Sequence, residues 1–417
     1  MFNDLDLEEV EEVFTPGAPI LRREFFVGRE RELDELRKAI RRRGYHPVVT
    51  GDRGVGKTSL VRQAFGKAKA VFVTCNSEMT FDEFARAALR ELGVAVAVTE
   101  SEHESSKSLS GGGAVFGIGA EASGTSTTRS KLRALGADKI DPWRLYLELR
   151  DLGRKVVVVL DEYDVVVSAN ATFHRGVAEL MKTLADHSSD CDSRLVIVGI
   201  AQSAKLLLGR HESIERSAAE VYLHPLDSVA IYAFLASAEE ELRFKFNSAV
   251  KDAIVDTSGG YPYFVHLVGL ECVESMLKRD PAERVVNEHD YKVAVGRAVR
   301  RAFRAELRKY SNAMRSLSEL DMAIVREIAS LGRRDRNVTP EELERRVVFV
   351  TRLPLNDVRA AFERVSAQGL IFVTSTNRYI RFRDPLLAPF IRAVMLPELG
   401  PEMDVRQLSL FGSEGSA

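Results

Sequence analysis

The sequence has few cysteines and no long apolar run. Only three of its 417 residues are cysteine (Cys75, Cys191 and Cys272), and they are too scattered for a disulfide framework or a metal box. The apolar tract 156–160 ends at Asp161, far short of the roughly 18 residues that a membrane-spanning helix needs. The N-terminus is acidic where a secretory signal would be basic and then apolar. These absences exclude an integral membrane protein and predict a protein of the reducing cytoplasm.

The sequence also lacks an excess of either charge. Lys and Arg number 59 and Asp and Glu 61, which leaves a formal net charge of -2. This balance excludes a histone-like basic protein, so any surface for nucleic acid must be a local patch. With 45% apolar and 29% charged residues, the chain has the composition of a globular protein. Its length predicts two or three domains.

Short β-branched runs alternate with helical patterns over residues 25–226. The runs lie at 47–50, 70–75, 155–160, 194–200 and 220–226. This alternation predicts an α/β domain whose parallel sheet is covered by helices on both faces. Within it, residues from about 97 to 135 are rich in Gly, Ser and Thr, which predicts a flexible insertion.

The segments around this domain have different compositions. Residues 1–24 are acidic and then contain Pro and Gly, which favours an arm lying on the domain rather than a helix within it. Residues 227–310 show a purely helical pattern broken by SGGYP at 258–262, which predicts a small helical lid and linker. Residues 311–396 predict three helices and two short strands, the order of a winged helix. Residues 397–417 predict a flexible tail.

A phosphate-binding motif follows the first predicted strand. Residues 51–58 read Gly-Asp-Arg-Gly-Val-Gly-Lys-Thr and precede a helical pattern, which is the full P-loop sequence in its required context. In such a loop, backbone N–H groups and the helix N-terminus surround the phosphates of ATP. Lys57 is predicted to reach the β- and γ-phosphates, and Thr58 to ligate Mg²⁺. The predicted nucleotide contacts of this loop are Gly51, Asp52, Arg53, Gly54, Val55, Gly56, Lys57, Thr58 and Ser59.

Two acids end the third predicted strand, in VVVVLDEYD. An ion held on one hydroxyl needs a carboxylate near a neighbouring strand end, so Asp161 is the second predicted Mg²⁺ ligand. Glu162 is then predicted to orient and polarise the attacking water. The alternative is that the two acids only cap the strand.

These motifs, with FFVGRERELDELRKAI before them, resemble the AAA+ and STAND ATPases, most of all the origin-recognition-like and archaeal-type branch. The resemblance covers roughly residues 14–396. It implies that the FVGRE segment lies against the adenine. It therefore suggests base-side contacts from Phe26, Val27, Gly28 and Arg29, although on composition alone Gly28 is a turn and Arg29 a surface charge.

The resemblance implies three further elements. Gln202 would sense the γ-phosphate after the fourth strand, in place of the commoner Asn. Arg216, or else Arg210, would act on the nucleotide of a neighbouring subunit, and the alternative for either arginine is a surface charge. Pro262 resembles the Gly-x-Pro feature of STAND ATPases. The arginine that many AAA+ lids carry is missing, which favours a slow, partner-regulated switch over a fast motor.

The predicted winged helix is basic. Residues 297–392 carry 20 Lys and Arg against 11 Asp and Glu, so the rest of the chain is acidic. Such segregation suits phosphate neutralisation and predicts DNA binding of weak sequence specificity. The candidate DNA contacts are Arg359 and Arg364 on the presumed recognition helix and Arg378, Arg381 and Arg383 on the wing. Winged helices also dock proteins, and that alternative stays open.

The tail holds an isolated apolar pentapeptide, Gln407-Leu408-Ser409-Leu410-Phe411. It is similar to the bacterial sliding-clamp-binding motif, whose consensus is Gln-Leu-Ser/Asp-Leu-Phe. Leu410 and Phe411 would be pocket anchors, and Gln407 would set the register. The resemblance implies a bacterial protein working beside the replisome. The alternative is a tail that folds back onto an apolar groove.

Two functions are consistent with these features. The first is an ATP-binding and ATP-hydrolysing switch, with Mg²⁺, that self-associates with nucleotide, holds DNA and docks on the sliding clamp. The second is a STAND-type signalling or defence regulator whose winged helix and insertion bind proteins rather than DNA.

Overall fold

The computed structural model describes residues 5–65, 70–94, 138–200, 204, 208, 216–302, 312–332, 338–373, 379–384 and 387–395. The chain divides into two compact units that interleave in sequence. The first unit consists of Met1–Asp34, Gly51–Ala64 and Tyr222–Ala417, and the second of Glu35–Thr50 and Phe65–Val221. The predicted insertion and the predicted tail lie outside the described residues, and the predicted domain boundaries stay predictions.

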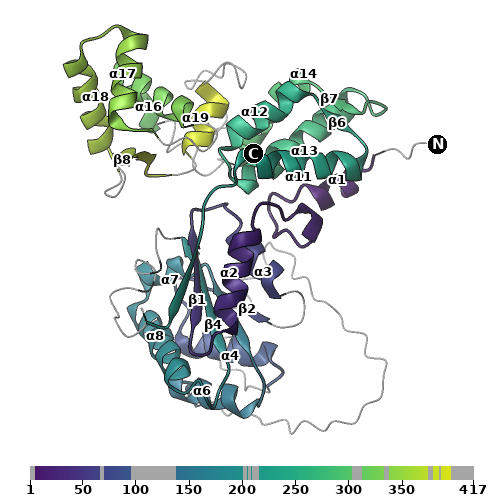
Figure 1. Ribbon diagram of the computed structural model, residues 1–417, viewed down its shortest axis with the longest axis vertical. Coiled ribbons are helices and arrows are strands. Elements are labelled where there is room, and N and C mark those ends of the chain that lie inside the picture. Colours follow the sequence, from purple (N-terminus) through teal and green to yellow (C-terminus); the bar gives the residue numbers. More distant parts are fainter. Residues whose placement is uncertain are drawn as a thin grey trace, which may run out of the picture. The chain divides into compact units, whose positions relative to one another are not determined.

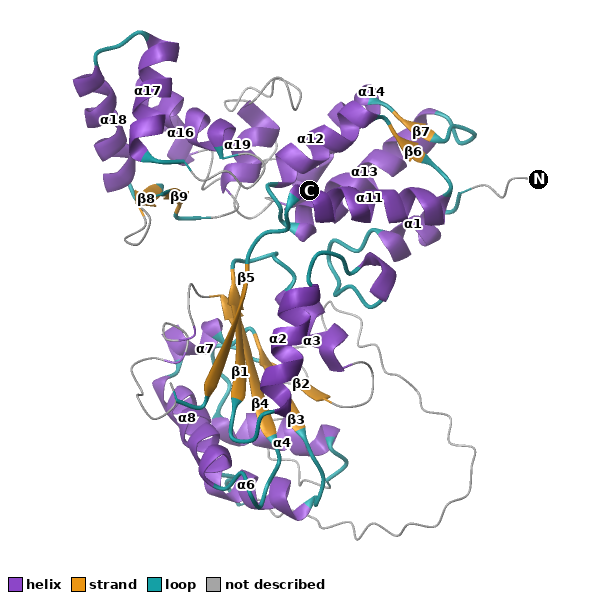
Figure 2. Ribbon diagram, viewed as in Figure 1, coloured by secondary structure: helices purple, strands orange, loops and turns teal. Residues whose placement is uncertain are grey.

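A five-stranded sheet is built from the five β-branched runs (Figures 1 and 2). The strands are β1 (His46–Gly51), β2 (Ala70–Thr74), β3 (Val157–Asp161), β4 (Arg194–Ile200) and β5 (Ala218–Leu223), in the spatial order β2-β3-β4-β1-β5. The pairs β1–β4, β2–β3 and β3–β4 are parallel. The predicted α/β fold with a parallel sheet is therefore confirmed.

Both faces of the sheet are buried, as parallel strands require. Val158 and Leu160 join a core that includes residues of α4 (Phe81–Glu91), α6 (Pro142–Asp151), α7 (Asp164–Ala169) and α8 (Ala171–Asp186). Val157 and Val159, which alternate with them and point to the other face, are also buried. Each buried Val or Leu side chain contributes about 1.5–3 kcal/mol of transfer free energy, which explains why these strands read as continuous apolar runs.

The first unit contains the helices on either side of the P-loop sequence, α2 (Glu30–Arg41, whose second half lies in the other unit) and α3 (Lys57–Phe65). It also contains the helices that directly follow the sheet. These are α11 (Ser228–Leu242), α12 (Ser248–Ser258), α13 (Pro262–Arg279) and α14 (Glu288–Ala302). The prediction of a purely helical segment here is wrong. Two short parallel strands, β6 (Lys245–Phe246) and β7 (Val285–Val286), pair within it. Two-residue strands carry no measurable hydrophobic period, so the sequence pattern could not reveal them.

The N-terminal arm contains a helix, α1 (Leu7–Val13), and a 3₁₀ turn, η1 (Arg23–Phe25). The prediction of an arm rather than a helix is wrong over α1, because Asp6 caps the helix by accepting a hydrogen bond from the Glu8 N–H. Val10 and Phe14 are fully buried. The rings of Phe14 and Phe234 pack edge to face, with their centroids 5.5 Å apart. Apolar anchoring therefore stabilises a helix that is too short to persist alone.

The C-terminal module, residues 312–395, has the predicted order of elements. Three helices, α16 (Glu319–Leu331), α17 (Pro340–Thr351) and α18 (Leu355–Ala367), precede the antiparallel pair β8 (Ile371–Val373) and β9 (Ile380–Phe382). A further helix, α19 (Leu387–Met395), packs on α16 and also on α12 and α14. Among the described residues, no helix combines the length and apolarity needed to cross a bilayer.

Candidate nucleotide site and C-terminal surface

The P-loop connects β1, which ends at Gly51, to α3, which begins at Lys57. Gly54 and Gly56 have φ values of 80° and 94°, in the left-handed region that residues with a Cβ rarely adopt. The Nζ of Lys57 donates to the carbonyl oxygens of Gly51 at 3.1 Å and Asp52 at 2.8 Å. The ammonium group therefore lies within the curve of the loop, where a phosphate group could exchange with neutral carbonyl acceptors.

The N-terminal arm is attached to the first turns of α3. The Oγ of Ser59 accepts a hydrogen bond from the Ile20 N–H at 3.1 Å. The Nε2 of Gln63 donates to the carbonyl oxygens of Ile20 at 2.9 Å and Leu21 at 2.8 Å. Ser59 was predicted to contact the nucleotide, but its hydroxyl is engaged by the arm. Thr58, the predicted Mg²⁺ ligand, is half-buried beside it.

Arg29 contacts the P-loop backbone. Its side chain is almost fully buried, and its Nη2 donates to the Val55 carbonyl at 3.1 Å and also to the His224 carbonyl. Its Nη1 donates to Glu32 at 3.0 Å, and burial lowers the pKa of Arg29. The surface-charge alternative is therefore excluded for Arg29, which holds the P-loop backbone. Phe26 and Val27 are half-buried, while Gly28 is exposed at the turn before α2.

The lid contacts the P-loop through the start of α13. The Tyr261 hydroxyl donates to the Asp52 carboxylate at 3.0 Å, and the Tyr263 N–H donates to the Gly54 carbonyl at 3.4 Å. Burial, followed by the neighbouring Asp52 charge, raises the pKa of Tyr261, so its hydroxyl stays a donor. Pro262 is the first residue of α13. The sequence analysis missed Tyr261, although it noted the SGGYP break in which this residue lies.

In the second unit, the predicted acids lie at the carboxyl edge of the sheet. β3 ends at Asp161, whose carboxylate accepts a hydrogen bond from the Glu162 N–H at 3.0 Å. Glu162 is exposed and has a φ of 56°. The next acid, Asp164, accepts from the Ile200 N–H at 2.8 Å, just after the buried part of β4. Because β1, β3 and β4 are parallel, Thr50, Asp161 and Ile200 end at one edge.

Asp161 is bordered by a buried thiol. The Cys75 N–H donates to the Asp161 carbonyl at 2.8 Å. Burial, together with the charges of Asp161, Glu162 and Asp164, raises the pKa of Cys75 to about 12. Cys75 is therefore a neutral thiol at physiological pH and no nucleophile.

Of the residues predicted to sense the γ-phosphate or to act on a neighbouring subunit, the structure describes only some. Gln202 and Arg210 lie outside the described residues, and Arg216 is exposed in the turn before β5. Glu220 on β5 is a residue that the sequence analysis missed. Its carboxylate accepts from the Ala204 N–H at 2.7 Å and from the Thr50 hydroxyl at 3.4 Å, which links the end of β1 to the residues after β4.

The predicted DNA contacts on α18 are engaged in ion pairs. Arg359 forms two hydrogen bonds of 3.1 Å with the Glu344 carboxylate, one from Nε and one from Nη2. Arg364 donates to Asp321 at 2.7 Å, and the Asp321 side chain is only 5% exposed. Burial opposes ionisation of Asp321, but hydrogen bonds from Arg364 and Ser318 outweigh it and lower its pKa. Both arginines are therefore already paired with carboxylates of the module.

The structure describes two of the three predicted wing residues. Arg381 and Arg383 are exposed on and just after β9, and Arg378 lies outside the described residues. The tail pentapeptide 407–411 also lies outside them.

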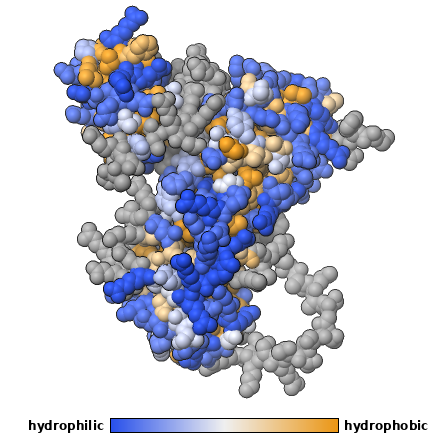
Figure 3. Space-filling view, viewed as in Figure 1, coloured by the Kyte–Doolittle hydropathy of each residue, from blue (hydrophilic) through white to orange (hydrophobic). Residues whose placement is uncertain are grey.

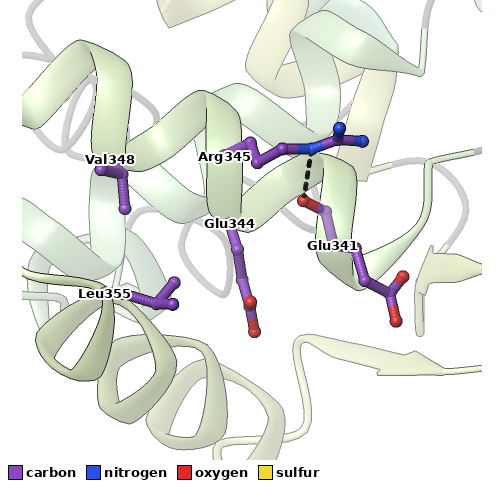
Figure 4. Close-up of a pocket in the computed structure, with 5 residues that line it drawn as sticks. All are labelled: Glu341, Glu344, Arg345, Val348 and Leu355. Carbon is purple, nitrogen blue, oxygen red and sulfur yellow. Dashed lines mark hydrogen bonds between the residues drawn. The ribbon is translucent and has the colours of Figure 1, made fainter.

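An apolar patch covers the end of α17 and the start of α18. It consists of Phe349, Val350, Leu353 and Leu355, with exposed fractions of 75%, 49%, 39% and 40%. Figure 3 shows apolar surface at this end of the module. Beside the patch is a hollow lined by Glu341, Glu344, Arg345, Val348 and Leu355 (Figure 4). Two acids, Glu341 and Glu344, are among its lining residues. The Nε of Arg345 donates to the backbone carbonyl of Glu341 at 3.3 Å.

Comparisons with known proteins agree with this geometry. Residues 26–198 match the family described as "AAA ATPase domain". A Walker-type ATPase of Pyrococcus abyssi has a similar fold, with a TM-score of 0.55 at 18% identity, covering 91% of this chain and 99% of that one. The ORC2 protein of Aeropyrum pernix, in ADPNP–ADP complexes, has a TM-score of 0.50 at 12% identity and covers 95% of both chains. A search of curated proteins found no match.

The matched segment begins at Phe26, contains the P-loop and both strand-end acids, and stops within β4. The likeness of the two archaeal structures extends over nearly the whole chain and supports the fold. Residues 26–198 are therefore similar to the AAA ATPase domain family, and the chain has the P-loop ATPase fold of these two structures.

Proposed function

We propose that this protein binds ATP with Mg²⁺ and hydrolyses it slowly, as a nucleotide-dependent switch. The observation that carries the proposal is the P-loop: left-handed glycines curve it around the Lys57 ammonium, which donates to the carbonyls of Gly51 and Asp52. This arrangement fits a polyphosphate anion. The ADPNP–ADP complexes of the Aeropyrum pernix protein support the same ligand class.

In this proposal Lys57 binds the β- and γ-phosphates, while Thr58 and Asp161 hold Mg²⁺. The ion would neutralise charge that develops on the phosphate oxygens. Glu162 polarises the attacking water, and its exposure on a fixed turn leaves its carboxylate accessible. Gln202 senses the γ-phosphate, and Arg216 acts on the nucleotide of a neighbouring copy, which requires nucleotide-dependent self-association.

The test is ATP binding and turnover by the full chain. The wild type should bind a fluorescent ATP analogue and release phosphate. K57A should weaken binding by about a hundredfold, because charge-assisted bonds to phosphate are lost. K139A is a matched control, since Lys139 is an exposed lysine that is not part of the P-loop sequence. Equal binding by K57A and K139A would contradict the proposal.

We further propose that the C-terminal module is a winged helix that binds DNA with little sequence preference. The basic excess of residues 297–392 supports it. The main candidate contacts are Arg381 and Arg383, which are exposed, and Arg378, which lies outside the described residues. DNA retention that falls steeply with salt and changes between ATP and ADP is the expected result. Absence of retention at low salt would contradict it.

The tail pentapeptide is proposed to dock on the bacterial sliding clamp. Its support is the match of residues 407–411 to the consensus. Purified clamp should co-elute with the full chain, and L410A/F411A should abolish co-elution because both apolar anchors are removed. S409D is the control, because the consensus accepts Asp at that position. Equal binding by all three chains would contradict tail docking.

The second candidate function is a regulator whose C-terminal module binds a protein. It is supported by the apolar patch at Phe349–Leu355, which is a poor surface for DNA phosphates and a usual one for protein contact. One titration that measures both ATP turnover and DNA retention distinguishes the two candidate functions. ATP turnover without DNA retention at low salt, together with lost partner binding in F349S, favours the regulator.

A further inference from the structure

Residues 258–261, the hinge turn between α12 and α13, lie at the meeting point of three parts of the first unit. The Gly260 carbonyl accepts a hydrogen bond from the Leu226 N–H at 2.7 Å, which attaches the turn to the segment that follows β5. A Cβ on Gly260 would lie 2.5 Å from the Leu226 carbonyl oxygen, so the approach requires glycine. The turn is therefore tightly held on this side.

On the second side, the hinge turn contacts the P-loop. Tyr261 is 7% exposed, and its hydroxyl donates to the Asp52 carboxylate at 3.0 Å. The carbonyl of the same Asp52 accepts from Lys57 Nζ at 2.8 Å. When phosphates bind Lys57, they compete with this carbonyl, so nucleotide binding and the Tyr261 contact act on the same residue of the loop.

On the third side, the hinge turn contacts α19 of the C-terminal module. Arg392 is 4% exposed, its Nε donates to the Ala329 carbonyl at 2.9 Å, and its Nη2 donates to the Gly332 carbonyl at 2.7 Å. Its remaining nitrogen, Nη1, abuts Gly259 so closely that a Cβ there would overlap it. Two nitrogens thus attach the guanidinium to the end of α16, and the third lies beside Gly259 of the hinge turn.

We propose that Arg392 and Tyr261 are positioning residues that couple the docking of the C-terminal module to the nucleotide affinity of the P-loop. Arg392 fixes the hinge turn, the turn fixes Tyr261, and Tyr261 holds the Asp52 carboxylate. Without that hydrogen bond, the negative Asp52 carboxylate is no longer held in place and turns toward the phosphates, which it repels. The proposal rests on the proposed ATP binding and adds a route by which events at the module regulate it.

A double-mutant cycle tests the coupling. The four chains are the wild type, Y261F, R392K and Y261F/R392K, and the measured quantity is the Kd of a fluorescent ATP analogue. Lysine keeps the charge of Arg392 but cannot donate through three nitrogens. Each single variant should weaken binding about fivefold, the lower end of usual coupling between sites. The double variant should bind no more weakly than Y261F alone, because the two act through one contact.

A matched control uses Tyr232, whose hydroxyl donates to Asp252 and joins α11 to α12 away from the P-loop. Y232F removes the same kind of hydrogen bond, so Y232F/R392K should show the effect of R392K undiminished. Thermal melts of all chains identify any variant that has unfolded, in which case R392Q replaces R392K.

The outcomes separate the two proposals. If the wild type binds no ATP analogue, the proposed function fails. If it binds and the effects of Y261F and R392K multiply, or if either leaves Kd unchanged, the coupling is wrong. Fivefold losses that do not multiply support it.

Discussion

The P-loop and the C-terminal module both present cationic side chains, but these side chains have different partners. Lys57 donates to two neutral carbonyl groups, whereas Arg359 and Arg364 donate to the carboxylates of Glu344 and Asp321. A phosphate that binds Lys57 competes with the neutral carbonyls of Gly51 and Asp52. A phosphate that binds Arg364 must separate an ion pair and leave the buried Asp321 carboxylate without its charged partner. The availability of a cation for an anionic ligand therefore depends on the acceptor that it already has.

The largest expected effect tests the catalytic side of this comparison. E162Q should lower ATP turnover by about a hundredfold or more, because it removes the proposed base that polarises water. ATP affinity should change little, since Gln is isosteric and Glu162 is not a proposed phosphate contact. D164N is the control, because Asn can still accept the hydrogen bond from Ile200. Unchanged phosphate release by E162Q would remove Glu162 from the mechanism.

Lowering the pH should destabilise the regions around His46 and His266 but not the C-terminal module. His46 and His266 are buried, and burial lowers the pKa of each to about 4. Each accepts a backbone hydrogen bond through Nδ1, from Leu195 and Thr15 respectively, which requires the neutral ring. Since the unfolded pKa is about 6.5, their stabilisation is complete above that pH and is lost as pH falls toward 4.

Unfolding free energy should therefore fall by about 2 kcal/mol per histidine between pH 6.5 and pH 5. No histidine follows His289 in the sequence, so the C-terminal module should not share this loss. H266N keeps an acceptor for the Thr15 N–H without titrating in this range. Denaturant titrations of the wild type and H266N across this range, followed by hydrogen exchange, measure both effects. An identical pH dependence in H266N would contradict the role of His266.

The two arginines of α18 should differ in their contribution to stability. R364A should lower the unfolding free energy of the module by about 2 kcal/mol, because it leaves the nearly buried Asp321 carboxylate without its charged donor. R359A removes a more exposed pair and should cost less than about 1 kcal/mol. Thermal melts of the full chain distinguish them. Equal and negligible losses would show that Arg364 is available for DNA.

The smallest expected effect concerns the wing. R381A/R383A should weaken DNA retention about tenfold at low salt and reduce its salt dependence, with no change in melting temperature. R359A, already used above, is the control, because its guanidinium is occupied by Glu344. If R359A weakens retention as much as the wing variant does, the ion pair opens to DNA and the comparison between the two regions no longer holds.

The sheet could be predicted from the sequence because each strand is a continuous apolar run, and the P-loop because its residues are contiguous. Contacts between residues that are far apart in the sequence could not be predicted. Arg29 lies 26 residues before its P-loop partner, and Tyr261 lies 209 residues after Asp52. The sequence shows that a residue can donate, but only packing decides which acceptor it meets. Arg364 is the clearest example. The basic composition of residues 297–392 predicts a DNA contact for it, whereas in the structure it forms an ion pair with Asp321.

The backbone of Glu162 has a further consequence. A residue with a Cβ at φ 56° is less stable there than glycine by about 1 kcal/mol. A search for stabilising substitutions would therefore favour glycine at exactly the position where the proposed chemistry needs a carboxylate. Stability and turnover are in opposition at this residue, and thermostable variants chosen without an activity screen would tend to lose the ATPase first.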